Sequence, residues 1–161
     1  MSAAGPGRAT VRFERCDPEE FPADELLAAM RSELNDVYET FSRLDNPPLA
    51  PAELRPPGGG YYVGYEGTQP VAGGGVRRLG DGVAEIKRMY VRPEARSRGI
   101  AAALLRTLED AAHALGYASV RLDTGSKQVH AQRLYRAAGY VEVPAYNENP
   151  FACFWGEKRL G

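Results

Sequence analysis

The pattern of hydrophobic and polar positions changes from that of a strand to that of a helix within residues 85–115. Its first part is an apolar and aromatic run, typical of a buried strand, at Ile86, Met89, Tyr90 and Val91. Pro93 ends this strand because proline has no N–H to donate to a neighbouring strand. Apolar residues then recur at helical spacing along one face, at Ile100, Leu104, Leu108, Ala111 and Leu115. Gly116 follows as the predicted left-handed end of the helix.

The same two periods predict the other elements. Alternation or short apolar runs predict strands at residues 10–16, 61–65, 71–79, 120–122, 140–143 and 151–155. One further helix begins at Asp24, with its apolar face formed by Leu26, Leu27, Met30, Leu34, Val37 and Phe41. The last helix has its apolar face at Ala131, Leu134, Tyr135 and Ala138 and ends at Gly139. The order β-α-β-β-β-α-β-α-β-β predicts an α+β fold with a mixed sheet.

Glycine and proline mark the connections. Residues 44–60 contain five prolines and three consecutive glycines, and a loop of this length more often forms a lid or a binding loop than a linker. The glycines at 73–75 stand inside a strand pattern, which favours a β-bulge there. Residues 1–9 are predicted to be a flexible N-terminus, and residues 10–161 a single domain.

Composition narrows the class of protein. The formal net charge of −1 gives no general attraction to nucleic acid or to an anionic membrane. No apolar run approaches the roughly 20 residues that a membrane-spanning helix needs, and no apolar signal core is present, so a cytoplasmic location is expected. Cys16 and Cys153 are far apart, show no metal-ligand spacing, and are expected to be reduced thiols.

The loop Arg96-Ser97-Arg98-Gly99-Ile100-Ala101 joins the central strand to the following helix. Backbone N–H groups at the start of a helix have no internal partner, and the helix dipole is positive there. Small residues at 99 and 101 let a ligand approach the backbone, and Arg96 and Arg98 add forked cationic donors. The pattern therefore indicates a site for a phosphate or pyrophosphate. On its own it is equally compatible with an ordinary loop carrying exposed arginines.

Three pieces together resemble the GNAT acetyltransferase superfamily. Arg96-x-x-Gly99-x-Ala101 resembles the family's coenzyme A pyrophosphate loop, Gln/Arg-x-x-Gly-x-Gly/Ala. EIKRMYV resembles its central strand, and AQRLYRAAGY its second conserved block, so the resemblance covers roughly residues 61–160. It implies a GNAT-like single domain with a mixed, mostly antiparallel, twisted sheet flanked by helices, and acetyl-coenzyme A (acetyl-CoA) as the acyl donor.

The resemblance also implies roles for single residues. Tyr135 matches the tyrosine that in many members faces the coenzyme sulfur, where its phenol could protonate the departing thiolate; the alternative is a core aromatic residue. Glu85 matches a position that often holds an acidic residue, which could take a proton from the acceptor amine; the alternative is a strand carboxylate paired with Lys or Arg. His113 and His130 are expected to be surface residues.

Coenzyme binding is implied for two groups of residues. Met89, Tyr90 and Val91 would offer backbone groups to the thioester and the pantetheine arm, and the loop would bind the pyrophosphate through Arg96, Ser97, Arg98, Gly99, Ile100 and Ala101. Gln128 stands where the family commonly has Asn, and its longer side chain puts its coenzyme contact in doubt.

The expected function is direct transfer of an acetyl group from acetyl-CoA to a primary amine of a small molecule or peptide. Homodimers are common in the family, so a homodimer is one expected assembly. Two other classes of protein remain open. One is a nucleotide-dependent kinase, although no Gly-Lys-Ser/Thr loop or Mg²⁺-binding motif supports it. The other is a non-catalytic sensor of the same fold that binds an acyl-CoA.

Overall fold

Strand β4 (Val83–Val91) lies at the centre of a seven-stranded sheet. The structure is a computed structural model, and it describes residues 10–38 and 49–161. The strand order is β1-β2-β3-β4-β5-β7-β6, and β4 and β5 run parallel while the other neighbouring pairs are antiparallel. The remaining elements are β1 (Arg12–Cys16), α1 (Ala23–Val37), the 3-10 helix η2 (Pro51–Leu54), β2 (Gly60–Glu66), β3 (Gln69–Gly80), the 3-10 helix η3 (Pro93–Ala95), α2 (Ile100–Ala114), β5 (Ser119–Gly125), α3 (Val129–Ala137), β6 (Val141–Glu142) and β7 (Ala152–Arg159).

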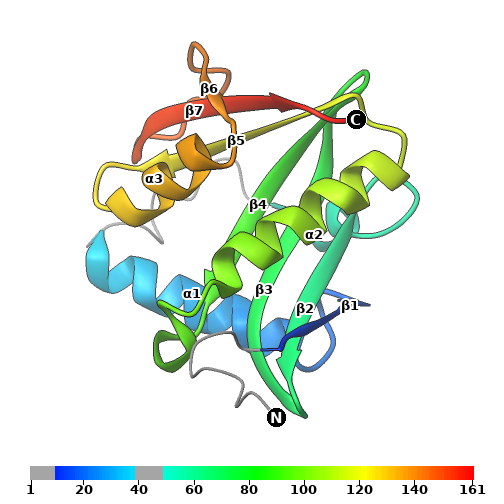
Figure 1. Ribbon diagram of the computed structural model, residues 1–161, viewed down its shortest axis with the longest axis vertical. Coiled ribbons are helices and arrows are strands. Elements are labelled where there is room, and N and C mark those ends of the chain that lie inside the picture. The colour runs from blue at the N-terminus through cyan, green and yellow to red at the C-terminus, as the bar shows by residue number, and fades with distance from the viewer. Residues whose placement is uncertain (1–9, 39–48) are drawn as a thin grey trace, which may run out of the picture.

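Helices cover both faces of the sheet. Helix α2 lies across β3 and β4 (Figure 1), and its apolar face joins the larger core together with α3. This core includes Ile86 of β4, Leu122 of β5, and Leu104 and Leu108 of α2. A smaller core on the opposite face is formed by Ala23 and Leu26 of α1, Leu54 of η2, and Tyr61 and Val63 of β2. Because strand side chains alternate between faces, the residues next to Ile86 and Leu122 point to the α1 face.

A β-bulge interrupts β4 where it faces the glycine run of β3. Gly73 pairs with Tyr90 and Gly75 with Lys87, so two steps along β3 face three steps along β4. Arg88 supplies the extra residue, with a φ of 60°. As a result Met89 returns to the α2 face, whereas Tyr90 packs on the α1 face.

The glycine run is also required by close packing. A Cβ on Gly73 would lie 2.2 Å from the Tyr61 hydroxyl oxygen, and one on Gly75 would lie 2.6 Å from Leu54 Cδ2. At either position a side chain would force a residue of the smaller core, Tyr61 or Leu54, to move. The predicted bulge is confirmed, although the extra residue belongs to β4 rather than to the glycine strand.

The α+β architecture and the predicted order of strands and helices are confirmed. β5 and β7 are longer than expected, because they pair over seven residue positions from Ser119 to Gly125. Pairing of this kind stabilises positions that carry Arg, Glu and Lys, such as Arg121 opposite Glu157. The expectations for residues 1–9, for Phe41 and for residues 44–48 lie outside the described residues.

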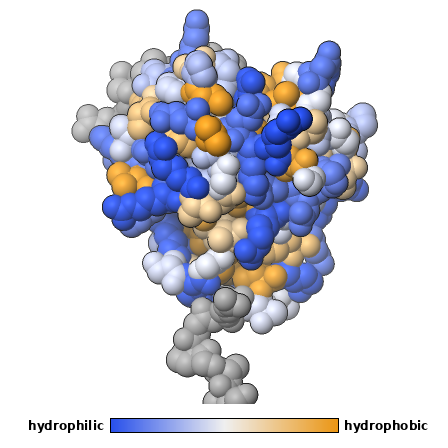
Figure 2. Space-filling model, turned by 45° about the horizontal axis from the view of Figure 1, so that its top comes forward, coloured by the Kyte–Doolittle hydropathy of each residue, from blue (hydrophilic) through white to orange (hydrophobic). Residues whose placement is uncertain are grey.

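The surface gives few apolar features. Figure 2 shows polar and charged residues over most of one face, with apolar residues in small separate groups. Large hydrophobic side chains that are exposed in the described residues are Phe21, Val129 and Val141. No helix in the part of the chain that the structure describes is long and apolar enough to cross a membrane.

Candidate active site

The parallel pairing between β4 and β5 is short, and the two strands separate beyond it. Only Val83, Ala84 and Glu85 of β4 pair with β5, opposite Ser119, Val120 and Arg121. β4 continues to residue 91 and β5 to residue 125, and Figure 1 shows the two strands diverging. We call residues 86–91 and 122–125 the β4–β5 fork. On its β5 side, β4 therefore has backbone N–H and C=O groups without a strand partner, and these remain able to bind a ligand.

The predicted phosphate loop follows the fork and opens α2. Gly99 precedes the helix with a φ of 79°, and Ser97 also has a positive φ of 64°. The first intrahelical hydrogen bond runs from the Ala103 N–H to the Gly99 carbonyl, at 3.2 Å. The N–H groups from Gly99 to Ala102 precede this bond and point out of the helix start. They have the arrangement that binds a phosphate.

The two arginines of this loop are paired with carboxylates. Arg96 Nη2 lies 2.7 Å from Glu33 Oε2 of α1, and its Nε donates to the Val91 carbonyl at 2.9 Å. Arg98 forms an ion pair with Glu66 at the end of β2. The positive charge expected at the loop is therefore compensated in this structure, and an anionic ligand would compete with Glu33 and Glu66.

Tyr135 lies in the larger core with its hydroxyl directed at the fork. The side chain is 7% exposed, and its hydroxyl contacts the Met89 sulfur of β4 at 3.7 Å. Among the described residues this hydroxyl has no nitrogen or oxygen partner. Burial raises the pKa of Tyr135 above its usual value, with a further increase from the nearby charge of Asp123. The phenol therefore remains protonated and able to donate at neutral pH.

Gln128, the residue before α3, is engaged locally. Its Oε1 accepts from the Gly125 N–H at 2.9 Å and from the Thr124 hydroxyl at 3.1 Å. These contacts close the turn that follows β5. The side-chain oxygen is thus occupied, which supports the doubt raised by the replacement of Asn by Gln. His113 and His130 are exposed, as expected.

Glu85 is fully buried, and both of its oxygens are engaged. Oε1 accepts from Arg77 Nε at 2.8 Å, and Oε2 accepts from the Tyr146 hydroxyl at 2.7 Å. Lys87 Nζ lies 3.6 Å from the same Oε2. Both oxygens of Glu85 therefore already have a donor, and a proton from an amine would have to displace one of them.

Glu85 belongs to a chain of alternating charges on the α1 face. Arg77 also pairs with Glu53 at 2.7 Å, and Lys87 Nζ lies 3.7 Å from Asp123 Oδ1. We call these five residues, Glu53, Arg77, Glu85, Lys87 and Asp123, the Asp123 chain. It runs from η2 across β3 and β4 to β5 and ends at the fork.

The connection between β6 and β7 forms hydrogen bonds with two residues of the Asp123 chain. Tyr146 donates to Glu85, and Asn147 Nδ2 donates to Asp123 Oδ2 at 2.6 Å. Asn147 in turn accepts from the indole N–H of Trp155 at 2.9 Å. Burial raises the pKa of Tyr146 well above its usual value, and the charge of Glu85 raises it further. Tyr146 therefore acts as a hydrogen-bond donor over the whole physiological range.

Sequence reasoning did not identify Asp123, Lys87, Arg77 or Tyr146. One usable signal was the alternation of Val120, Arg121, Leu122 and Asp123, which places Asp123 on the polar face of its strand. No local pattern indicates that Tyr146 reaches Glu85, because this contact joins a loop to a strand 61 residues away.

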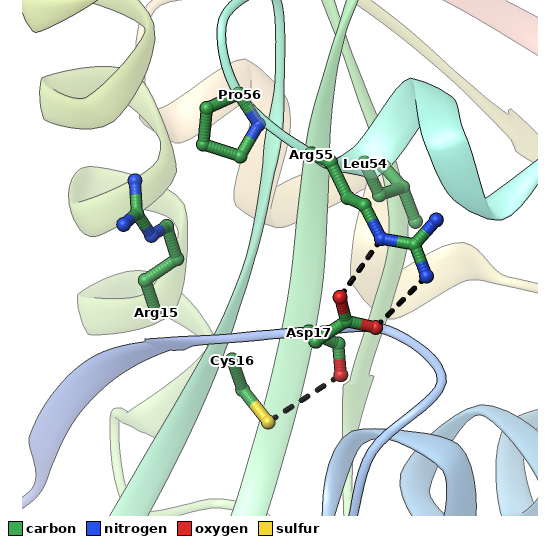
Figure 3. Close-up of a pocket in the computed structure, with 6 residues that line it drawn as sticks. All are labelled: Arg15, Cys16, Asp17, Leu54, Arg55 and Pro56. Atoms are coloured by element: carbon green, nitrogen blue, oxygen red, sulfur yellow. Dashed lines mark hydrogen bonds and ion pairs between the residues drawn. The ribbon is translucent and has the colours of Figure 1, made fainter.

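A separate hollow of about 320 Å³ lies beside β1 and η2 (Figure 3). Arg55 spans it, with Nε 2.8 Å from Asp17 Oδ2 and Nη2 3.0 Å from Oδ1. Arg55 and Asp17 are thus paired with each other, and none of the Asp123 chain lines the hollow. The fork and the phosphate loop are therefore the better candidate for chemistry. Within residues 10–38 and 49–161, no group of three His, Cys, Asp or Glu side chains could hold a metal ion.

Comparison with known proteins identifies the family. The model of the acetyltransferase (GNAT) family matches residues 26–140, and the chain belongs to this family. An IAA acetyltransferase of Azospirillum brasilense is 29% identical over 151 residues, which cover 89% of this chain and 95% of that protein. An uncharacterized N-acetyltransferase of Schizosaccharomyces pombe is 38% identical over 71 residues, which cover 44% of each protein. A crystal structure from Klebsiella pneumoniae, assigned as an acyl-CoA N-acyltransferase, covers 96% of this chain with a TM-score of 0.74 and 26% identity, and all of that chain is covered.

Proposed function

We propose that this protein transfers an acetyl group from acetyl-CoA directly to a primary amine of a small molecule or peptide. The family uses acetyl-CoA as its cosubstrate. The observation that carries the proposal is the convergence of three features on one fork: the unpaired edge of β4, the open N-terminus of α2, and the Tyr135 hydroxyl. Each provides one requirement of acyl transfer, namely alignment, phosphate binding and a proton donor.

The residues of this chain divide the work as follows. The N–H groups from Gly99 to Ala102 bind the pyrophosphate, joined by Arg96 and Arg98 once they leave their carboxylates. The backbone of Met89, Tyr90 and Val91 aligns the thioester and the pantetheine arm along the free edge of β4. The bulge at Arg88 increases the local twist of β4. We infer that this twist keeps the backbone groups of residues 89–91 from pairing with β5, so that they remain available to the ligand.

Acetyl-CoA supplies the thioester. The amine nitrogen forms a bond to the acetyl carbon, and the bond from that carbon to sulfur breaks. The acceptor enters as an ammonium ion and loses two protons in all, one before attack and one during transfer. Tyr135 donates a proton to the departing thiolate and regains one from the acceptor side, so one proton is released to solvent. The carboxylates of the Asp123 chain favour the acceptor cation on this side of the sheet.

Coenzyme binding is tested by thermal unfolding with acetyl-CoA, CoA and ATP. Acetyl-CoA at a hundredfold excess over its Kd should stabilise the fold by about 2.7 kcal/mol, which is roughly 5–11 °C in Tm for a chain of this size. Gly99→Val should abolish this gain by filling the approach to the loop. Gly82→Val is the matched control, because Gly82 also has a positive φ, of 71°, and open space around it but lies in the β3–β4 turn. Equal responses of the two variants would contradict the predicted loop.

Transfer is tested by measuring thiol release over a panel of amines, amino acids, aminoglycosides and peptides. IAA belongs in the panel because relatives in Azospirillum brasilense and Bacillus cereus are named IAA acetyltransferases. Coenzyme binding without thiol release on any acceptor would favour the acyl-CoA sensor. Stabilisation by ATP but not by CoA would contradict the proposal as a whole.

A further inference from the structure

The Asp123 chain has one more carboxylate than it has cations, so its formal net charge is −1. It contains three carboxylates and two cations, which alternate along its length. Both ends of the chain are therefore anionic. The end at Glu53 is 38% exposed and can be solvated, whereas the side chain of Asp123 is only 7% exposed. A buried anion without a full counter-charge favours the binding of a cation.

Nearby cations do not supply this charge in full. Lys87 Nζ is shared between Glu85 and Asp123, at 3.6 Å and 3.7 Å, beyond hydrogen-bond distance of either carboxylate. Arg121, on the same face of β5, is already paired with Glu157 at 3.2 Å. Asn147 gives Asp123 a neutral hydrogen bond. Among the described residues, the one cation near Asp123 Oδ1 is therefore Lys87, which lies 3.7 Å away and is shared with Glu85.

A second observation, independent of the charges, points to a ligand at the same place. The Tyr135 hydroxyl is buried, directed at the fork, and without a nitrogen or oxygen partner in the described chain. Its one partner there, the Met89 sulfur, is a weak acceptor, so an oxygen or nitrogen of a ligand can replace it. Burial, and then the charge of Asp123, raise the pKa of Tyr135. Tyr135 reaches the fork at Met89 from the α2 face, and Asp123 lies in the fork on the α1 face, so a donor and an anion both adjoin the point where β4 and β5 separate.

Aromatic side chains adjoin Asp123. Trp155 is its cross-strand partner on β7, and Tyr146 comes from the connection that covers the chain. Both are partly exposed. Tyr38 and Phe151 form a further ring contact, at 4.9 Å between centroids, next to the turn that follows β5. An ammonium group at Asp123 would lie beside aromatic faces, which attract cations and pack against apolar groups.

We propose that Asp123 binds the ammonium group of the acceptor, and that the acceptor carries a single positive charge on an apolar arm. This inference rests on the proposed acetyltransferase function and specifies its substrate class. One leftover negative charge matches one ammonium group, so a monoamine fits better than a polyamine. Glu85 then holds Lys87 and Arg77 in place, and Asp123 is the carboxylate that touches the substrate.

The test compares Asp123→Asn with the parent protein, with phenethylamine as the monoamine and spermidine as the polyamine. Trp155 is the one tryptophan of the chain and is hydrogen-bonded to Asn147, which binds Asp123, so its fluorescence reports amine binding without turnover. In the CoA complex, phenethylamine should change this emission, and Asp123→Asn should weaken its binding about 10- to 100-fold, the range for losing a hydrogen bond to a charged group. The KM for phenethylamine should rise by the same factor. The response to acetyl-CoA should not change.

Asp81→Asn is the matched control. It removes the same charge from a fully exposed carboxylate in the β3–β4 turn and should leave amine binding unchanged. Unchanged phenethylamine affinity in Asp123→Asn overturns the role of Asp123 while leaving the acetyltransferase function intact. Tighter binding of spermidine than of phenethylamine, or no response of Trp155 to phenethylamine, overturns the assigned substrate class. Failure of the parent to bind acetyl-CoA at all would instead remove the proposed function.

Discussion

Two buried carboxylates, Glu109 and Glu85, lie on opposite faces of the sheet and differ in how neighbouring cations balance their negative charge. Glu109 of α2 pairs with Lys158 at 3.1 Å and accepts from the Tyr140 hydroxyl at 2.8 Å. We call these three residues the Glu109 cluster. It contains one anion and one cation and ends there. Glu85 belongs instead to the Asp123 chain, which continues across three strands and ends on another carboxylate.

The difference separates a structural use of buried charge, in the Glu109 cluster, from the use in substrate binding that we propose for the Asp123 chain. A closed, balanced cluster satisfies its own groups and leaves nothing for a ligand to complete. An unbalanced chain retains a group that a ligand can satisfy, at some cost to stability. The Glu109 cluster faces the well-packed core under α2, and the Asp123 chain ends where β4 and β5 separate. The candidate site is therefore distinguished by a carboxylate whose charge is not fully balanced, rather than by the presence of any single residue type.

Two neighbouring tyrosines give the strongest test of this comparison. Tyr135 and Tyr140 have ring centroids 5.9 Å apart, but only the Tyr140 hydroxyl has an oxygen partner. Tyr135→Phe should lower kcat by about 10²- to 10⁴-fold, the range for losing a general acid, with little change in stability or coenzyme affinity. Tyr140→Phe should leave kcat unchanged and lower the free energy of unfolding by roughly 1.5–3 kcal/mol, because Glu109 loses a donor.

Steady-state kinetics and urea unfolding on both variants decide the matter. Full activity in Tyr135→Phe would return Tyr135 to a purely packing role. A loss of kcat in Tyr140→Phe would mean that the Glu109 cluster also serves the chemistry, and the comparison would fail.

The alkaline side of the stability curve provides a second test. Burial, and then a neighbouring carboxylate, raise the pKa of both Tyr140 and Tyr146, so both phenols remain neutral in the folded protein. In the unfolded chain they ionise near pH 10. Above that pH the unfolded state binds fewer protons than the folded state, so the stability present below pH 10 is lost as the pH rises. Each such tyrosine contributes a slope of up to about 1.4 kcal/mol per pH unit.

Removing either hydroxyl should flatten this loss to the same extent, as measured by urea unfolding between pH 8 and pH 11. Measuring acetyl transfer distinguishes the two variants further, because only Tyr146→Phe removes a hydrogen bond from an oxygen of Glu85, beside the fork. Acetyl transfer should therefore change in Tyr146→Phe and not in Tyr140→Phe. An identical effect of both variants on transfer would argue against a special role for the Asp123 chain.

Sequence periodicity predicted the fold well because the core depends on local patterns. The spacing from Ile100 to Leu115 determines which face of α2 is buried, and the apolar run at Ile86 and residues 89–91 indicates a buried strand. α2 ends within a residue of its predicted end. The turn and helix start of the candidate phosphate loop were also predictable, since its glycine and its position before a helix are local features. The pairing of its arginines with Glu33 and Glu66 was not visible, because both carboxylates come from distant elements.

The candidate site was only half predictable for the same reason. Tyr135 and Glu85 were predicted through resemblance to a family, and their catalytic roles stay predictions. The partners of Glu85 come from β3 and from the β6–β7 connection. The position of the fork depends on where two parallel strands stop pairing. Nothing in the composition of β4 or β5 records that point. Asp123 could be placed on a polar face, but its meeting with Lys87 is a tertiary contact.

The smallest predicted effect concerns Glu66, a carboxylate that pairs with Arg98 in this structure and that we expect a coenzyme pyrophosphate to displace. Glu66 and Arg98 are 40% and 35% exposed, so their ion pair is screened and contributes less than about 1 kcal/mol. A coenzyme pyrophosphate must replace Glu66 at Arg98, and Glu66→Ala should therefore lower the Kd for CoA about two- to fivefold. The gain should shrink with added salt. Glu142→Ala is the control, since it removes an exposed carboxylate paired with Arg136 on β6, at the opposite edge of the sheet from β1. Calorimetric titration of CoA into both variants measures the difference. An unchanged or higher Kd in Glu66→Ala would mean that Arg98 belongs to a closed pair like Lys158 and Glu109, and that the backbone of residues 99–102 binds the phosphate without it.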